Sequence, residues 1–152
     1  MPETEEYGVA SYVYRARAPF IPARISDALN GDLAGVIRAK GHFWIATRPD
    51  WVAEFSLAGA LSSVAPLRTW WAAVPEERWP QNESGRQHLR AHWQEPWGDR
   101  RQEIVFIGAG IDWLALKARL DDCLVPADMA TGPHDLPGFP DPFPIWRRAE
   151  QA

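Results

Sequence analysis

The chain has 152 residues, of which 46% are hydrophobic and 24% charged, and a formal net charge of −4. This length fits one domain, and a domain of this size buries roughly 68–70% of the surface that its unfolded chain exposes. The acidic balance excludes a surface that neutralises many phosphates of a nucleic acid, and no uncharged run approaches the roughly 18 residues that a membrane-spanning helix requires.

Cysteine usage and the start of the chain predict the compartment. Cys123 is the single cysteine, so no internal disulfide is expected. No basic segment followed by an apolar one opens the sequence, as a secretory signal would require. We therefore expect a cytoplasmic protein with no membrane contact. Residues 1–8 are expected to be a disordered lead, residues 9–146 the domain and residues 147–152 a tail.

The first elements predicted along the chain are a strand and a short helix. Residues 9–16 are rich in tyrosine and valine, which favour a strand. Pro22 suits the first turn of a helix, and the apolar residues that follow at helical spacing are Ile25, Ala28 and Leu29. Gly31 is expected to end this helix in a positive-φ conformation.

Residues 36–46 predict a strand with two different faces. One face carries Ile37, Ala39, Gly41, Phe43 and Ile45, and the other carries Arg38, Lys40, His42 and Trp44. One apolar and one mostly polar face are typical of an antiparallel sheet that is covered on one side, so we expect helices to pack on the Phe43 face. Residues 51–58 alternate similarly and predict the second strand of a hairpin, with residues 59–66 as its continuation or a loop.

The second half adds a helix, a strand and a second helix. Residues 83–93 predict a short helix after an aperiodic stretch, and residues 102–107 predict a central strand, covered on both faces, because four apolar residues follow one another. Asp112 is a candidate N-cap for a helix that reaches Cys123. An irregular tail follows, with Phe143 and Trp146 as its anchors. This order predicts an α+β fold of two layers, an antiparallel sheet of about four strands with helices on one face.

Signatures of common enzyme classes are absent from the sequence. The phosphate-binding pattern Gly-x-x-x-x-Gly-Lys-Ser/Thr does not occur, and Gly108-Ala109-Gly110 lacks the third glycine of a dinucleotide-binding turn. No serine lies in a Gly-x-Ser-x-Gly elbow. Cys123 lies on the apolar side of its helix beside two aspartates, which raises a thiol pKa and predicts an inert residue. We therefore predict no catalytic and no cofactor-binding residues.

His88 and His92 are the candidate metal ligands. They are four residues apart on a predicted helix and would project from one face, as a two-histidine site requires. Further ligands would have to come from a set that comprises Glu83, Glu95, His134, His42 and Cys123. A solvated helix face is the alternative, and we favour it because two ligands do not make a site.

Cations gather at the charged ends of the predicted strands. They are Arg15, Arg17, Arg38, Lys40, Arg100 and Arg101. On adjacent strands they would form a basic face suited to carboxylates or phosphates of a partner. Equally, Asp99 and Glu103 would neutralise them within the sheet. The predicted partner-binding residues are Arg17, Arg38, Lys40, His42, Trp44, Arg100 and Arg101.

Five spaced blocks of the sequence form a pattern, and they are Pro19–Arg24, Arg38–Trp44, Trp70–Trp71, Gly98–Gly108 and Asp141–Pro144. Together these blocks resemble the C-terminal domain of the CobW family of metallochaperone GTPases. The first block departs from the family pattern, since Ile21 stands in place of a histidine and Ala23 in place of a glutamate. Any role of that histidine is therefore not carried over to this chain.

The resemblance implies an interaction domain rather than an enzyme. In such proteins an N-terminal P-loop GTPase domain hydrolyses nucleotide and carries a Cys-x-Cys-Cys metal site, and the C-terminal domain helps to engage the client. Neither motif occurs in this sequence. We therefore expect a non-enzymatic accessory domain in zinc or cobalt handling, which meets the metal only transiently. Its expected partners are a P-loop GTPase domain, in cis or in trans, and a metalloprotein client. The alternative is a small standalone metal-binding protein that uses His88 and His92.

Overall fold

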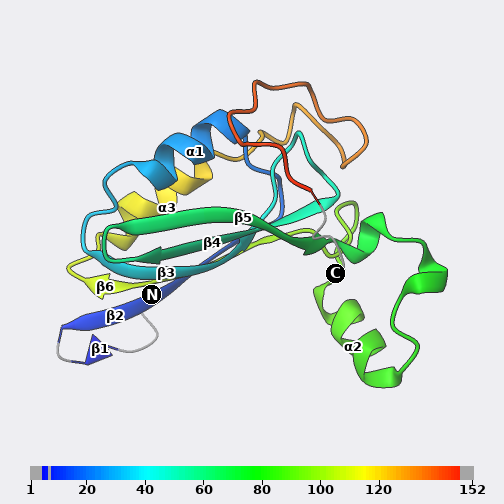
Figure 1. The fold of residues 1–152 in the computed structure, drawn as a ribbon, viewed down its shortest axis with the longest axis horizontal. Coiled ribbons are helices and arrows are strands. Elements are labelled where there is room, and N and C mark those ends of the chain that lie inside the picture. Colours follow the sequence, from blue (N-terminus) through cyan, green and yellow to red (C-terminus); the bar gives the residue numbers. More distant parts are fainter. Residues whose placement is uncertain (1–4, 7, 148–152) are drawn as a thin grey trace.

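One antiparallel sheet runs through the computed structural model, which describes residues 5–6 and 8–147 (Figure 1). The elements are β1 (Glu5–Glu6), β2 (Val9–Ala16), α1 (Pro22–Asn30), β3 (Val36–Phe43), β4 (Trp51–Ala58), β5 (Leu61–Thr69), α2 (Glu83–His92), β6 (Gln102–Ala109) and α3 (Trp113–Asp121), with 3₁₀ turns at Trp71–Ala73 and Glu76–Arg78. The strand order is β1-β2-β6-β3-β4-β5, so the late strand β6 lies between the early strands β2 and β3. The predicted α+β class is confirmed.

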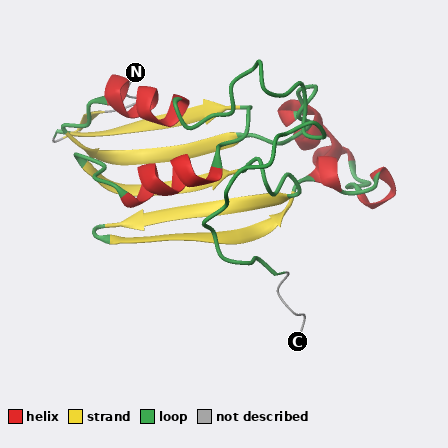
Figure 2. Ribbon diagram, turned by 90° about the horizontal axis from the view of Figure 1, so that it is seen from above, coloured by secondary structure: helices red, strands yellow, loops and turns green. Residues whose placement is uncertain are grey.

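Helices α1 and α3 cover one face of the sheet, as Figures 1 and 2 show. Helix α1 starts with Pro22 in its first turn and buries Ile25, Ala28 and Leu29, which matches the predicted stripe. Phe43 of β3 is 0% exposed and lies in the core beneath these helices. The prediction that helices pack on the Phe43 face is therefore confirmed.

The sheet has more strands than the four that the sequence predicts. Strand β5 occupies residues that we expected to continue β4 or to form a loop, and it pairs with β4 along its whole length. It lies at the edge of the sheet, where Pro66 is tolerated because an edge strand does not need every N–H for pairing. Gly59 forms the connecting turn with a φ of +62°. At the opposite edge, Glu5 and Glu6 form β1 within the expected disordered lead, whereas residues 1–4, 7 and 148–152 lie outside the described part of the chain.

Three local expectations also need correction. The register of β3 shifts between Val36 and Arg38, so Val36 packs against the core and Ile37 is 49% exposed instead. Gly31 has a φ of −83°, and a side chain there would meet the guanidinium of Arg119, so space rather than backbone conformation requires this glycine. Strand β6 is central but covered on one face only, since Val105 is half-buried on the other.

The segment of residues 70–98, which contains α2, projects from one end of the sheet rather than covering a face (Figure 1). Asp99 and Arg17 make several of the hydrogen bonds that tie it to the sheet. The carboxylate of Asp99 accepts from the backbone N–H groups of Trp71 and Ala72 at 3.0 and 2.9 Å. The Nη1 of Arg17 donates to the carbonyl of His92 at 2.7 Å and to that of Gly98 at 3.1 Å. The α2 segment therefore contacts the sheet at Arg17, which directly follows the last residue of β2.

The irregular tail is anchored as predicted. Trp146 is 9% exposed and belongs to the core, and Phe143 packs beside it. Asp141 accepts hydrogen bonds from Arg48 Nε at 2.9 Å and Nη2 at 3.1 Å, and Arg48 lies 4.2 Å from the centre of the Trp146 ring. None of the three α-helices in the described part has the length and hydropathy that crossing a bilayer requires.

Candidate functional site

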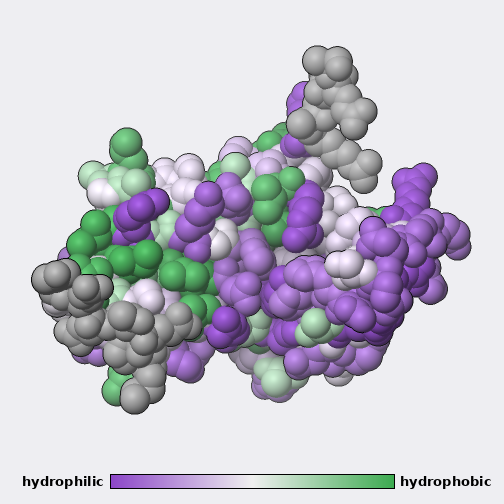
Figure 3. All heavy atoms as spheres, turned by 90° about the horizontal axis from the view of Figure 1, so that it is seen from below, coloured by the Kyte–Doolittle hydropathy of each residue, from purple (hydrophilic) through white to green (hydrophobic). Residues whose placement is uncertain are grey.

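The face of the sheet opposite α1 and α3 is open to solvent. Figure 3 shows this face, with hydrophobic side chains toward one end and hydrophilic ones over the middle and the other end. Val13, Val105 and Ile107 point outward from β2 and β6, and Arg38 and Lys40 point outward from β3. The alternation of β3 thus places the predicted cations on the side that no helix covers.

Arg38 and Lys40 are the accessible cations of this face. Both side chains are exposed, and neither forms an ion pair with any described residue. Register pairing sets Lys40 opposite Val105 on one side and Ser56 on the other, so no carboxylate is directly opposite. A cation with no internal partner remains available to an anionic group from outside.

A cavity of about 400 Å³ lies where the open face meets the α2 segment. Its charged and polar lining residues are Arg15, Arg17, His92, Arg101, Gln102 and Glu103. Arg15 and Glu103 face each other across the β2–β6 pair and form an ion pair with a distance of 3.2 Å between Nε and Oε2. The predicted neutralisation by Glu103 therefore applies to Arg15. Asp99 instead accepts from the backbone of the α2 segment.

His42 lies beside this cavity on β3, packed edge-on against Trp70 with ring centroids 5.8 Å apart. Burial, and then the positive charges of Arg101 and Arg68, lower the pKa of His42 to about 4. Its Nε2 is buried and has no hydrogen-bond partner among residues 5–6 and 8–147. The imidazole is therefore neutral at physiological pH.

Trp44 and Arg100 do not belong to an accessible surface, and the predicted partner-binding set is corrected for both. Trp44 is 0% exposed and donates from Nε1 to the carbonyl of Arg17 at 2.9 Å. Arg100 is 4% exposed, donates to the carbonyl of Pro49 at 2.6 Å and lies over the Trp44 ring. The reason for Trp44 is that β3 ends at Phe43, so the strand alternation used for the prediction no longer applies beyond it, and Arg100 lies in the loop before β6 begins at Gln102. The predicted contact residues that remain at the surface are Arg17, Arg38, Lys40, His42 and Arg101.

Gln102 is a site residue that the sequence analysis did not single out. It is 0% exposed, and its side chain continues the β3–β6 pairing where β3 has ended. Oε1 accepts from the backbone N–H of Trp44 at 2.8 Å, and Nε2 donates to the carbonyls of Ala18 and Trp44 at 2.8 and 3.1 Å. Its position on the same strand face as Ile104 was the available signal, because a buried amide must be hydrogen-bonded.

His88 and His92 lie side by side on α2, with ring centroids 4.6 Å apart. The candidates for a third ligand are engaged elsewhere: Glu83 pairs with Arg90, and Glu95 accepts from Trp93. Within residues 5–6 and 8–147, no three His, Cys, Asp or Glu side chains are arranged to hold a metal ion. Burial, followed by the charges of Arg101 and His88, lowers the pKa of His92, so the surroundings are cationic.

Cys123 is buried at the end of α3 and donates to the carbonyl of Arg119. Burial raises the pKa of its thiol, as expected for an inert residue.

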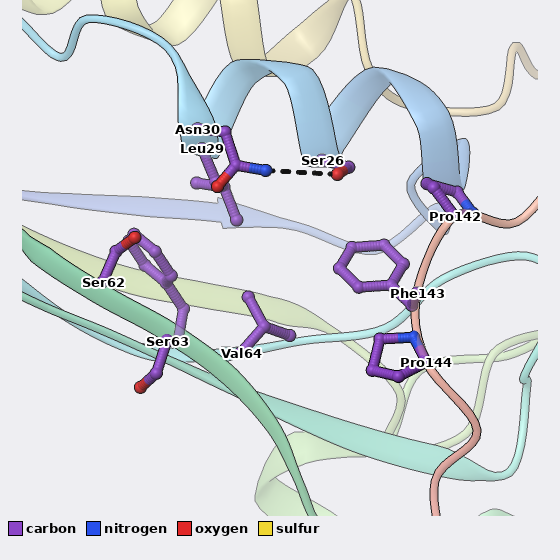
Figure 4. A pocket seen from close by; sticks show the side chains of 10 residues that line it. Ser26, Leu29, Asn30, Ser62, Ser63, Val64, Pro142, Phe143 and Pro144 are labelled. Atoms are coloured by element: carbon purple, nitrogen blue, oxygen red, sulfur yellow. Dashed lines mark hydrogen bonds between the residues drawn. The ribbon is translucent and has the colours of Figure 1, made fainter.

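A second cavity, of about 230 Å³, lies between α1, β5 and the tail (Figure 4). Ser26 and Asn30 line it from α1 and are hydrogen-bonded to each other at 3.3 Å. Ser63 comes from β5, and Phe143 closes the cavity from the tail. The residues that line it carry hydroxyl and amide groups and no ionisable side chain. None of the residues that line this cavity can act as a general base for its serines, so the cavity does not indicate a nucleophilic site.

Comparison with protein families gives a match over most of the chain. The sequence model of the family described as "Cobalamin synthesis protein cobW C-terminal domain" matches residues 9–124. Zinc-regulated GTPase metalloprotein activator 1 of Dictyostelium discoideum is 36% identical over 129 residues, which cover 82% of this chain and 27% of that protein. Zinc chaperone Rv0106 of Mycobacterium tuberculosis is 31% identical over 139 residues, which cover 91% of this chain and 35% of that protein.

The solved structures support the fold. The crystal structure of the Zn(II)-bound YjiA GTPase from E. coli aligns with a TM-score of 0.55 and 18% identity, and the alignment covers 78% of this chain and 30% of that one. A Zn(II)-bound triple mutant of the same GTPase gives a TM-score of 0.54 over the same shares. The chain thus spans about a third of the length of the relatives that it matches, or slightly less.

Proposed function

Since this chain belongs to the CobW C-terminal domain family, we propose that it is a non-enzymatic interaction domain that docks a P-loop GTPase domain, in cis or in trans, and helps it to engage a metalloprotein client. The matched region is 27% and 35% of the two curated relatives described above, so most of each relative lies outside it. A cytoplasmic location agrees with this role and is part of the proposal.

The observation that carries this proposal is the open sheet face. A sheet normally buries an apolar face, and here α1 and α3 cover one side while Arg38 and Lys40 stay exposed and unpaired among the described residues on the other. Half-buried Val13 and Ile107 add apolar area to the same face. Apolar area combined with cations suits a protein surface that carries complementary acids.

The names of the relatives support zinc as the metal, since one is a zinc-regulated GTPase metalloprotein activator and another a zinc chaperone. We propose that this domain acts beside the metal and contacts it only transiently. The second candidate, a standalone zinc site on α2, is favoured by the proximity of the His88 and His92 rings. The cationic surroundings of His92 favour the first candidate, because a nearby guanidinium repels a divalent cation.

A binding titration tests the docking proposal. The fluorescently labelled chain is titrated with a CobW-type P-loop GTPase domain, and anisotropy is recorded. We expect saturable binding, and a loss of about tenfold in affinity for Arg38→Glu combined with Lys40→Glu, because the reversed charges face the partner's acids. The matched control reverses Arg24 and Lys117, which are exposed on the helical layer. Equal losses for both double variants, or no binding by the unaltered chain, would contradict the proposal.

A zinc titration separates the two candidates. The docking proposal expects no submicromolar zinc binding by the chain alone, and no change when His88→Ala and His92→Ala are combined. Tight zinc binding that this double variant abolishes would establish the second candidate instead.

A further inference from the structure

The cavity at the end of the open face carries an excess of positive charge. Three guanidinium groups line it, those of Arg15, Arg17 and Arg101, and Glu103 is the one carboxylate among the lining residues. Burial alone would raise the pKa of Glu103, but the hydrogen bond from Arg15 and the charge of Arg101 hold it below its usual value. Glu103 is thus ionised and neutralises Arg15, which leaves Arg17 and Arg101 to face the cavity.

The guanidinium of Arg101 is under-satisfied. Within the described residues it donates one hydrogen bond, from Nη1 to the carbonyl of Asp99 at 2.9 Å, and its buried Nε has no acceptor although the residue as a whole is half-buried. A buried donor without a partner carries a free-energy penalty that an incoming acceptor removes. The Nε and Nη2 groups form one edge of the guanidinium, and that edge matches the two oxygens of a carboxylate or a phosphate. Binding through this edge requires the guanidinium to rotate until the buried Nε faces the cavity.

Local charges favour a single negative charge over two. Asp99 lies behind the cavity and, like Glu103, offsets part of the positive charge of Arg17. The three guanidinium groups carry three positive charges, and the carboxylates of Glu103 and Asp99 offset two of them, so the net charge around the cavity is +1. Arg68 adds a more distant positive charge along the sheet. A monoanionic carboxylate would neutralise this remaining charge, whereas a dianionic phosphate would leave one uncompensated negative charge beside Glu103 and would cost more to desolvate.

We propose that this cavity, between Arg15, Arg17 and Arg101, binds the carboxylate of an acidic side chain from a partner polypeptide. The inference rests on the proposed function, because it names the chemistry by which a docked partner reaches the end of the sheet. A volume of about 400 Å³ exceeds what one carboxylate needs, so the cavity also holds the aliphatic stem of the side chain.

The test uses an acetylated peptide of four glutamates, with a tetraglutamine peptide and inorganic phosphate as the other probes, titrated into the whole chain and followed by calorimetry at low salt. We expect saturable binding of the glutamate peptide, at least tenfold weaker binding of phosphate and no binding of the glutamine peptide. Arg101→Gln should weaken peptide binding at least tenfold. The matched control Arg24→Gln makes the same charge change on the helical layer and should alter affinity less than twofold. If Arg101→Gln does not fold, Arg15→Gln, with an exposed side chain, takes its place.

Several results would overturn the inference: no saturable peptide binding, tighter binding of phosphate than of the peptide, or equal effects of the cavity variant and the Arg24 control. Its failure is distinct from failure of the proposed function. If the GTPase domain binds but the peptide does not, the cavity assignment is wrong while the docking role stands. If the peptide binds and the GTPase domain does not, the docking role is wrong while the cavity assignment stands.

Discussion

The environment of His42 predicts a specific loss of stability in mild acid. Burial, and then Arg101 and Arg68, lower the pKa of His42 to about 4, against an ordinary value of about 6.5. Folding therefore disfavours protonation, so the contribution of the neutral ring is complete above pH 6.5 and is lost as the pH falls from 6.5 toward 4. At pH 5 the protonated form of His42 outnumbers the neutral form by a factor of about 30 in the unfolded chain, whereas in the folded chain the neutral form still dominates. Proton binding therefore stabilises the unfolded chain and hardly stabilises the folded one. The free energy of unfolding should therefore fall by about 2 kcal/mol between pH 7 and pH 5 through this one group.

Urea denaturation at both pH values, on the parent chain and on His42→Gln, measures this contribution. A glutamine does not titrate, so the variant should lose about 2 kcal/mol less than the parent between pH 7 and pH 5. His134→Gln serves as the control because His134 is exposed in the tail, and it should show the same pH dependence as the parent. If the parent and His42→Gln lost equal stability, the ring would be solvated in the folded protein, and the argument from burial would fail.

Two further predictions concern the core and the tail. Phe43→Ala should reduce the free energy of unfolding by about 3–5 kcal/mol because the side chain is fully buried. Lys40→Ala on the opposite face should cost about 0–1 kcal/mol because the side chain is exposed. Equal losses in urea denaturation would contradict the assignment of these two residues to opposite faces. Asp141→Asn should cost about 1–3 kcal/mol because it leaves the half-buried Arg48 unpaired. Burial alone would raise the pKa of Asp141, but Arg48 lowers it, so its stabilisation is present above the ordinary carboxyl pKa and is lost as pH falls through the lowered value. Limited proteolysis should then release the tail of the variant at neutral pH and that of the parent only in acid; an intact variant tail would contradict this.

Periodicity explains which elements could be predicted. Apolar alternation placed β3 and β4 and assigned Phe43 to the covered face, and the Asp112 side chain does accept from Ala115 N–H at the start of α3. Strand β5 escaped prediction because an edge strand needs little hydrophobicity: Ser62 and Ser63 are exposed and Pro66 interrupts the pattern. Its formation depends on pairing with β4, which is a tertiary contact that no local pattern carries.

The candidate site was predicted in composition but not in arrangement. Alternation assigns a side chain to a face only while the strand lasts, and β3 ends before Trp44. Arg100 carries the same charge as Arg101, yet it turns inward to the carbonyl of Pro49 while Arg101 lines the cavity. Arg100 and Arg101 differ because the loop between α2 and β6 directs their side chains to different sides, and the path of this loop could not be predicted from residue spacing in the sequence. The position of Gln102 on the buried face of β6 could be predicted, but its hydrogen-bond partners could not, because they come from chain segments distant in sequence.

The open face and the cavity are two parts of one surface, and the strand register shows how. Lys40 and His42 are two residues apart on β3, a spacing of roughly 7 Å, and His42 pairs with Glu103 at the cavity wall. Arg101 lies two residues beyond Glu103 on the β6 side, so a partner that sets acidic groups on Arg38 and Lys40 needs to extend about four residues, roughly 13 Å, along the strand direction to reach it. A loop carrying acidic residues spans that distance. Charge reversal at Lys40 and charge removal at Arg101 should then each weaken binding of the same partner, and their losses should add because the two residues lie more than about 10 Å apart along the sheet. A partner whose affinity changes with only one of the two variants would contradict a shared surface.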